Sequence, residues 1–324
     1  MNKLLVILIL SPLTLLAKPS LGKFFRPGWS ETAFSYETFH SIGNYDANGN
    51  LQSLPASNSF FKTEQLNLAG RYIFTPHWAF SAGLSHVNAQ SYVTNFSQSN
   101  GGLQNVHGSL EYRFELPSFD LGVAAEGLAS LYRADEQSSK PLYGDGAHGF
   151  GGSLWFAKRT ESFLWSGKFG YLYRSEGLSS VLPYELGVRW HWEALSLGAI
   201  GHGYWSALQD TSTDLQRHSL LNRNNAGSLH YRSANPSSSI LDLEVRWNAT
   251  EQFALVGGTG FTWSGRNASQ GSRIFVGFNL AWQVIRPTIE KSPLKNVIVK
   301  PPKPGKKEPP SPLFKEENFH QELD

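Results

Sequence analysis

The sequence of 324 residues contains no cysteine. Disulfide bonds, thiolate metal sites and a cysteine nucleophile are therefore excluded, as is a lipoprotein anchor, which needs an N-terminal cysteine. Charged residues make up only 17% of the chain, and the formal net charge is +2. Because nucleic-acid binders carry a concentrated basic face, this composition predicts no nucleic-acid partner.

Long hydrophobic runs are also absent. The most apolar stretch, Leu4 to Leu16, follows Lys3 and precedes Ala17, a small residue that suits cleavage. The stretch is too short to span a bilayer comfortably, so it predicts a secretory signal peptide over residues 1–20, with an uncleaved anchor as the alternative. No later stretch reaches about 18 apolar residues, so no helical span is expected. The mature chain is expected to be exported.

What the sequence does contain is a repeated alternation of apolar and polar residues. In "QLNLAGRYIF", residues 65–74, Leu66, Leu68, Tyr72 and Phe74 share one parity. This is the two-residue period of a strand with one apolar face, and that face could be buried in a soluble core or turned toward lipid. The pattern recurs at 106–114, 119–126, 163–174, 184–193, 241–248 and 273–284, and more weakly near 32–41, 78–86, 147–157, 195–206 and 253–263.

These segments add up to about twelve strands, each near the length that a tilted membrane strand needs. An even count suits a closed barrel with both termini on one side, and helical periodicity is absent from the same region. The sequence therefore predicts an all-β fold, a closed antiparallel transmembrane β-barrel of about twelve strands over residues 21–287.

The connections alternate in length, which is typical of membrane barrels with short periplasmic turns and long extracellular loops. Long connections are expected near 42–62, 87–104, 133–146, 174–183, 207–238 and 264–271, and tight ones at 75–77, 115–118, 158–162, 193–194 and 248–252. The apolar face ends in an aromatic residue at the short-turn rim, as at a lipid headgroup boundary: Phe74, Trp78, Phe114, Phe119, Phe156, Phe163, Trp192, Trp247, Phe253 and Trp282. We therefore expect the apolar face to contact lipid.

Over residues 31–284 the chain resembles the outer-membrane β-barrel proteins of Gram-negative bacteria. Its last strand, "GFNLAW", is similar to the carboxy-terminal assembly signal of that family, with Gly277, Leu280 and Trp282 at the matching positions. The resemblance implies location in the bacterial outer membrane, periplasmic termini and external loops. It also implies contact with outer-membrane lipid and lipopolysaccharide and recognition by the barrel-assembly machinery.

The chain beyond the barrel changes in composition. Residues 288–324 are rich in proline and lysine and end in acidic residues. Proline-rich chain favours extended, semi-rigid conformations, so we expect a disordered periplasmic tail. The alternative is a tether from the tail to peptidoglycan or a periplasmic protein.

The inward parity carries nearly balanced charges. A charged residue at mid-depth on the lipid face costs about 2–4 kcal/mol, so these side chains should line the lumen. The predicted lumen-lining residues are Arg71, Arg113, Lys168, Arg189, Arg246, Arg273, Glu111, Glu126, Glu185, Asp242 and Glu244. Such a balance predicts weak selectivity or a lumen plugged by ion pairs.

One arrangement suggests chemistry. His107 and Ser109 share a face, and pairing across the turn at 115–118 is expected to set His107 opposite Glu126. A serine beside a histidine and a carboxylate is the layout of an activated nucleophile, which makes Ser109, His107 and Glu126 catalytic candidates. The alternative is that they are ordinary polar lumen residues. The remaining histidines lack ligand spacing, so neither a metal site nor a cofactor is predicted.

Three functions follow from these patterns. The first is a passive or weakly selective channel for small polar solutes. The second is an outer-membrane lipid or ester hydrolase using Ser109, and the third is a structural barrel tethered to the cell wall through residues 288–324. The sequence alone does not choose the solute.

Overall fold

The structure is a computed structural model that describes residues 27–54, 58–134, 140–208, 210, 221 and 224–284. The chain divides into two units, Met1–Arg286, which contains the sheet, and Pro287–Asp324. The predicted signal peptide (1–20) and tail (288–324) lie outside the described residues. Within the described part of the chain, no helix is long and apolar enough to cross a membrane.

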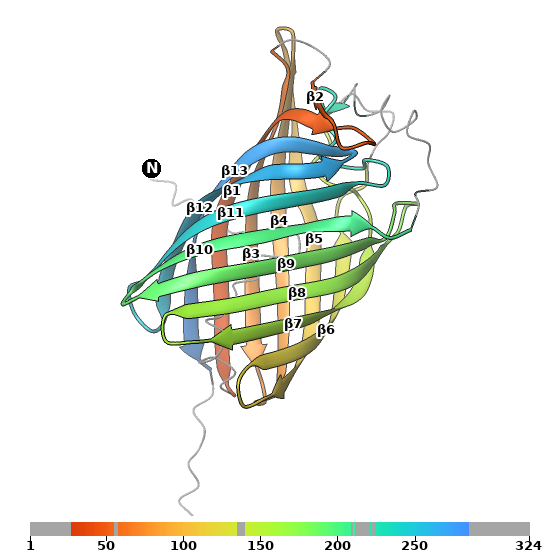
Figure 1. Ribbon diagram of the computed structural model, residues 1–324. Coiled ribbons are helices and arrows are strands. Elements are labelled where there is room, and N and C mark those ends of the chain that lie inside the picture. The colour runs from red at the N-terminus through yellow and green to blue at the C-terminus, as the bar shows by residue number, and fades with distance from the viewer. Residues whose placement is uncertain are drawn as a thin grey trace, which may run out of the picture. The chain divides into compact units, whose positions relative to one another are not determined.

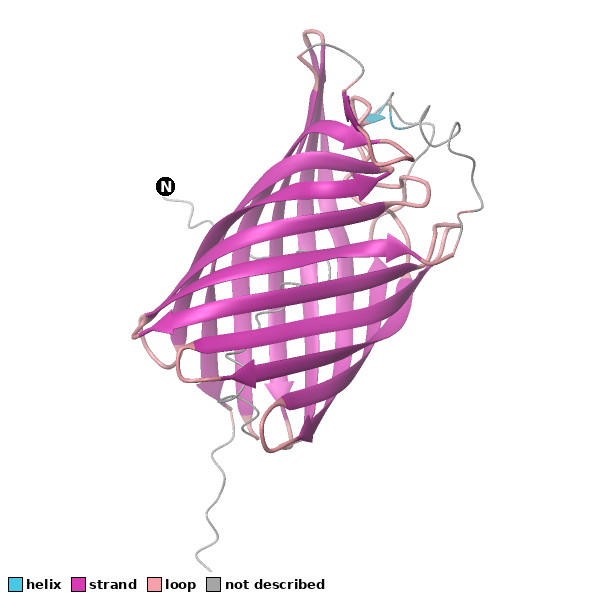
Figure 2. Cartoon of the chain, viewed as in Figure 1, coloured by secondary structure: helices cyan, strands magenta, loops and turns pink. Residues whose placement is uncertain are grey.

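Thirteen strands form a single sheet in the described residues (Figures 1 and 2). Twelve build the barrel wall, and the short β2 only extends a hairpin on β1. The bounds are β1 (Trp29–Tyr45), β2 (Leu51–Ser53), β3 (Phe60–Ile73), β4 (Trp78–Val93), β5 (Phe96–Glu115), β6 (Asp120–Ser130), β7 (Gly149–Arg159), β8 (Phe163–Arg174), β9 (Val181–Trp192), β10 (Leu195–Ser206), β11 (Ser237–Asn248), β12 (Phe253–Arg266) and β13 (Ala268–Gln283).

The sheet closes on itself. Neighbouring strands pair antiparallel in chain order, and β1 also pairs with β13 from Trp29↔Gln283 to Tyr45↔Ala268. Closure leaves no free sheet edge in the wall, which is what a β-structure needs where no water can satisfy its backbone groups. The predicted closed antiparallel barrel of about twelve strands is confirmed.

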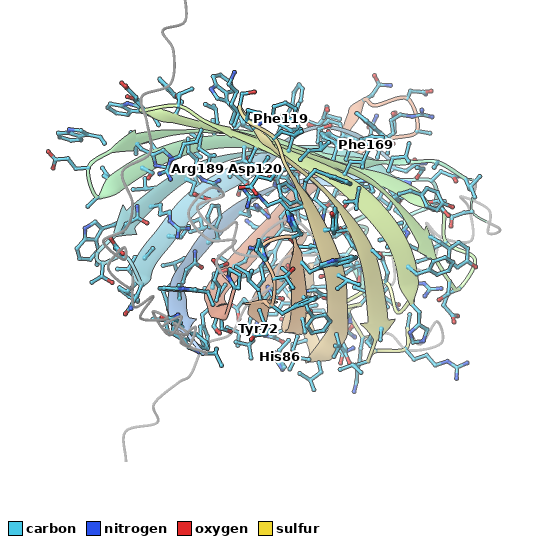
Figure 3. The ribbon with its side chains drawn as sticks, turned by 90° about the horizontal axis from the view of Figure 1, so that it is seen from below. Tyr72, His86, Phe119, Asp120, Phe169 and Arg189 are labelled. Carbon is cyan, nitrogen blue, oxygen red and sulfur yellow. The ribbon has the colours of Figure 1, made fainter. Side chains whose placement is uncertain are left out.

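The two faces of the wall differ as the alternation predicted. Along β3 the burial changes at every residue, with Leu66, Leu68 and Tyr72 partly exposed and Asn67 and Arg71 buried. In the view from below, Tyr72, His86, Phe119 and Phe169 lie toward the outside of the wall, whereas Arg189 and Asp120 point to its interior (Figure 3). The apolar face is therefore the outer one.

Aromatic residues mark both ends of the outer face. Nine of the ten predicted at the short-turn end are exposed, and Phe253 is half-buried. A second set, which the sequence analysis did not identify, is exposed toward the long-loop end: Phe150, Tyr173, Trp205 and Trp263. Two aromatic sets with an apolar band between them are what a transmembrane barrel presents to the two lipid interfaces.

Two of the predicted long loops are wrong. The segment 87–104 continues β4 and β5, which pair as far as Val93↔Phe96 around a two-residue turn at Thr94 and Asn95, both with positive φ. Similarly, Asn267 alone separates β12 from β13 along the chain, and beyond Phe261↔Ser272 these two strands continue by pairing with β11 and β1. The strand pattern is weak in the sequence of 87–104 because most residues on both faces of this hairpin are polar or small, so no continuous apolar face alternates with a polar one.

The register between β5 and β6 also differs from the prediction. Ser109, and not His107, lies directly opposite Glu126, and His107 lies opposite Leu128. The pairing begins at Glu115↔Asp120, so the four-residue turn comprises residues 116–119 and is displaced by one residue from the predicted 115–118. A shift of two residues keeps every side chain on its face, so the prediction that these residues point inward was unaffected.

Candidate functional site: the barrel interior and its cap

The inward charges gather in clusters that link strands two apart. On β9 and β11, Arg189 donates from Nε to Glu244 Oε1 at 2.8 Å and from Nη2 to Oε2 at 3.3 Å. Both side chains are less than a tenth exposed. Because this fork geometry satisfies both carboxylate oxygens, the two buried charges are well compensated.

A second cluster lies farther along the same wall. Arg273 of β13 pairs with Asp242 of β11 and, at 3.3 Å, with Glu37 of β1, and its guanidinium lies over the ring of Phe275. His202 Nε2 lies 3.0 Å from Asp242 Oδ2. One arginine therefore joins three strands around the seam between β1 and β13.

Further inward charges form ion pairs elsewhere along the wall. Arg71 contacts Glu111 at 2.9 Å and Glu31 at 3.8 Å. Lys168 Nζ lies 2.6 Å from Glu126 Oε1, and Arg113 Nε donates to Asp120 Oδ1 at 2.8 Å. The interior is thus crossed by short-range ion pairs on several strands.

The three catalytic candidates all face inward, but they do not form a relay. Ser109 Oγ is hydrogen-bonded to Ser81 Oγ at 2.6 Å, and Glu126 Oε1 accepts from Ser153 Oγ at 2.6 Å as well as from Lys168. His107 Nε2 is buried and has no hydrogen-bond partner among the described residues. A serine is activated only when a base lies within hydrogen-bond reach, and here the hydroxyl is engaged by another hydroxyl.

Several uncharged or aromatic residues also line the interior and were not among the predicted lumen-lining residues. His202, Trp155 and Phe275 lie on the inward parity, and the ring of Trp155 covers Gly122, where a Cβ atom would collide with it. The alternation itself could have identified them, since each occupies an inward position of its strand. Large side chains at such positions narrow a lumen as effectively as charged ones.

A folded cap covers the inner face of β1 and β3 near the long-loop end. We use this name for residues 140–148 and 224–236. Asn44 of β1 donates from Nδ2 to Gly227 O at 2.8 Å and accepts from Leu229 N at 2.9 Å, and Ser228 Oγ donates to Ser41 Oγ. The sequence left open whether the loop at 207–238 extends outward or folds in. The described part, from residue 224, folds in.

The two parts of the cap hold each other. Leu142 N donates to Asn225 Oδ1 at 2.9 Å, and Arg232 donates from its backbone and its guanidinium to Asp145, each at 2.7 Å. A small apolar core lies between them and the wall, formed by Tyr132, Leu142, Leu221 and Leu229. A loop segment with its own buried core and satisfied backbone groups is a structured element of the barrel interior.

His230 anchors the cap against the wall. Its ring stacks on Phe39 with centroids 4.3 Å apart and approaches Phe61, which is fully buried. Burial in this aromatic pocket lowers the pKa of His230 from 6.5 to about 4, although the Asp145 carboxylate acts in the opposite direction. The imidazole is therefore neutral at pH 7 and fits an apolar contact.

The described residues offer no group of three or more histidine, aspartate or glutamate side chains that could hold a metal ion. Several inward carboxylates are instead paired with an arginine, as in Arg189–Glu244 and Arg273–Asp242.

No protein-family model and no curated protein matches the sequence. Among solved structures, the barrel is similar to the COG4313 outer membrane channel from Pseudomonas putida F1, with a TM-score of 0.60 and 12% identity over 79% of this chain and 96% of that one. It is also matched to the NanC porin at a TM-score of 0.46, with 8% identity over 78% of this chain and 98% of that one. At these identities the likeness concerns the fold.

The fold and the two faces define the class of protein. A closed antiparallel barrel with an apolar outer band, aromatic ends and a charged interior has the architecture of an outer-membrane β-barrel. Within that class, its fold is similar to that of the Pseudomonas putida structure.

Proposed function

We propose that this protein is an outer-membrane channel for the passive or weakly selective passage of small polar solutes. The proposal rests on the difference between the two faces of the barrel wall. Ion pairs such as Arg71–Glu111 and Lys168–Glu126 make the inner face polar, whereas the apolar side chains Leu243 and Trp165 are about half exposed on the outer face. A passage through lipid that accepts polar solutes needs this division. Balanced pairs favour neither cations nor anions strongly.

The cap would be the gate of this channel. It covers the interior beside β1 and β3 through contacts that are numerous but individually weak, such as the hydrogen bonds of Asn44 and Ser228. Each hydrogen bond of this kind contributes about 0.5–1.5 kcal/mol net, and none of them belongs to the backbone ladders of the sheet, so the cap could be released while the wall stays intact. Release would widen the lumen without changing the wall.

An engineered disulfide bond between the cap and the wall tests both the channel and the gate. Because the chain has no native cysteine, only the introduced pair can form a disulfide. Ser41 and Ser228, whose Oγ atoms lie 2.9 Å apart, are replaced in S41C/S228C. Conductance of the purified barrel is then measured in a planar lipid bilayer under oxidising and reducing conditions. We expect discrete steps that are several-fold smaller, roughly two- to tenfold, in the oxidised form because the lock holds the cap in place.

The matched control is S81C/S109C, a hydroxyl pair 2.6 Å apart that joins β4 to β5 within the wall. Its conductance should not respond to reduction. Silence from the folded wild-type and reduced proteins alike would remove the channel proposal, and equal steps in both redox states of S41C/S228C would remove the gate.

The partners follow from the same proposal. The outer band would contact outer-membrane lipid and lipopolysaccharide, with Leu280 and Trp282 exposed on the last strand. With Gly277 these residues would form the signal that the barrel-assembly machinery reads. Residues 288–324 would lie in the periplasm.

A further inference from the structure

One of the inward basic residues has no carboxylate partner, although the inward charges are balanced in number. Of the six inward basic side chains predicted from the sequence, Arg71, Arg113, Lys168, Arg189 and Arg273 each have a carboxylate oxygen within 4.0 Å. The sixth, Arg246 of β11, has none among the described residues. A half-buried cation without a counter-charge is costly, so its surroundings indicate what it is for.

Amides take the place of carboxylates around Arg246. Its Nε donates to Asn248 Oδ1 at 3.0 Å. With the Asn279 side-chain amide oriented so that both of its polar groups are satisfied, Asn279 Oδ1 accepts from Nη1 at 2.8 Å and from Nη2 at 3.2 Å. These neutral groups fix the direction of the guanidinium, but they leave its charge uncompensated.

Two carboxylates of the inner face, Glu244 and Glu31, act on Arg246 electrostatically. Glu244 accepts from Arg189 with both oxygens, and Glu31 Oε2 lies 3.8 Å from Arg71 Nη1. Neither forms an ion pair with Arg246, so its guanidinium keeps a free face for a hydrogen-bonding anion.

A cavity opens beside Arg246. It has a volume of about 40 Å³. Small or apolar residues of β1, β12 and β13 line one part of it, and the ion pairs Arg189–Glu244 and Arg273–Asp242 together with Glu185 line the rest. This is room for a few water molecules, or for one carboxylate group that displaces them. Among the described lining residues, Arg246 is the arginine that has no carboxylate oxygen within 4.0 Å.

A further donor lies close by. His191 of β9 and Arg246 both pair in register with Ser196 of β10. His191 Nδ1 lies 2.7 Å from Ser196 Oγ, whereas its Nε2 is buried and without a hydrogen-bond partner among the described residues. If Ser196 donates to Nδ1, then Nε2 carries the hydrogen and adds a second donor to the same face.

We infer that Arg246, positioned by Asn248 and Asn279 beside this cavity, binds the carboxylate of a small organic anion. The planar fork of a guanidinium matches a carboxylate bidentately, which an ammonium group does not. The inference rests on the proposed function in that the anion reaches the site through the lumen. It makes the channel a selective one for small carboxylates in spite of its balanced charge.

Propionate is the probe. The thermal unfolding midpoint of the full-length barrel in detergent is measured in sodium propionate and in sodium chloride at equal ionic strength, and conductance in a bilayer is titrated with propionate. We expect propionate to raise the midpoint of the wild-type protein and to reduce its chloride current. In R246Q the apparent affinity should fall about tenfold or more, the loss of one charge-assisted bidentate contact.

Two variants make the result specific. R246K keeps the charge but not the fork, so binding should weaken while remaining detectable. R159Q removes the same charge from an exposed arginine at the end of β7, so propionate binding should be unchanged. Equal losses in R246Q and R159Q, or no effect of propionate on the wild-type protein, would overturn the inference. Because thermal stabilisation needs no conduction, a silent barrel that still binds propionate would refute only the channel.

Discussion

Arg189 and Glu244 show what a buried charge requires inside a membrane protein. Each side chain is less than a tenth exposed, and the burial of each charge is tolerated because the other one compensates it. Replacing Arg189 with methionine should destabilise the barrel by about 3–5 kcal/mol, because Glu244 would remain buried without a partner. The free energy of unfolding, measured by urea titration of the barrel in lipid vesicles, checks this expectation.

The double variant R189M/E244L provides the control. It removes both charges, so a large part of the lost stability should return even though the ion pair is gone. If the double variant were as unstable as the sum of its single variants, the penalty would come from packing and not from the orphaned carboxylate.

At this scale the sequence indicated which side chains face inward, but not which of them meet. Parity depends only on the two-residue period, so Arg71, Glu111 and Asp242 could be assigned from local pattern. Contacts depend on register, which is set by the exact turn. A shift of two residues was enough to exchange His107 for Ser109 opposite Glu126.

Among the elements, the cap is the one whose behaviour should depend on acidity. Burial lowers the pKa of His230 from 6.5 to about 4, so between these values the released loop takes up a proton that the packed loop cannot. Stability of the packed cap is therefore complete above pH 6.5 and falls as the pH drops toward 4, by about 3 kcal/mol in total. The side chains that contact His230 are aromatic or neutral: Phe39, Phe61 and Ser269 of the wall and Tyr231 of the cap.

We expect backbone amides of residues 224–234 to exchange hydrogen faster at pH 4.5 than at pH 7, after correction for the intrinsic rate. His230→Phe keeps an aromatic ring against Phe39 and cannot be protonated, so it should abolish the acid effect. His40→Phe changes an exposed histidine and should retain it. An acid response that survives in His230→Phe would assign it to another group.

The strands were predictable wherever one face meets lipid, and the cap was not. Its sequence, with "NRNNAGS" at 222–228, has no periodic alternation of apolar and polar residues and therefore predicts an exposed loop. The asparagines instead satisfy backbone groups in a buried setting, as Asn225 does for Leu142. The local sequence does not distinguish an asparagine in an exposed loop from a buried asparagine that satisfies backbone groups.

For the whole barrel, closure depends on the fit of β1 against β13. Gly277 lies at this seam, where a Cβ atom would collide with the carbonyl oxygen of Phe34 and the Cβ of Ser35. Gly277→Val should prevent closure, because neither obstacle is the flexible end of a side chain. Heat-modifiable migration in electrophoresis after expression measures the closed fraction.

Gly127 of β6 is the matched control, since a Cβ atom there would meet nothing within 4 Å. Gly127→Val should therefore assemble almost normally. Comparable loss in the two variants would mean that glycine is needed for strand flexibility and not for close approach at the seam. Gly277 also belongs to the predicted assembly signal. Repeating the assembly in lipid without the assembly machinery therefore distinguishes a loss of recognition by the machinery from a steric collision at the seam.

The same seam imposes an order of events. The strand that begins at Trp29 finds its second neighbour only in the strand that ends at Gln283, more than 250 positions later by their numbers. Until that final segment has been delivered, β1 keeps one unsatisfied edge, whatever the state of the strands between. Closure of the barrel therefore cannot precede the arrival of the last strand, and we expect β1 to need protection of its edge until then.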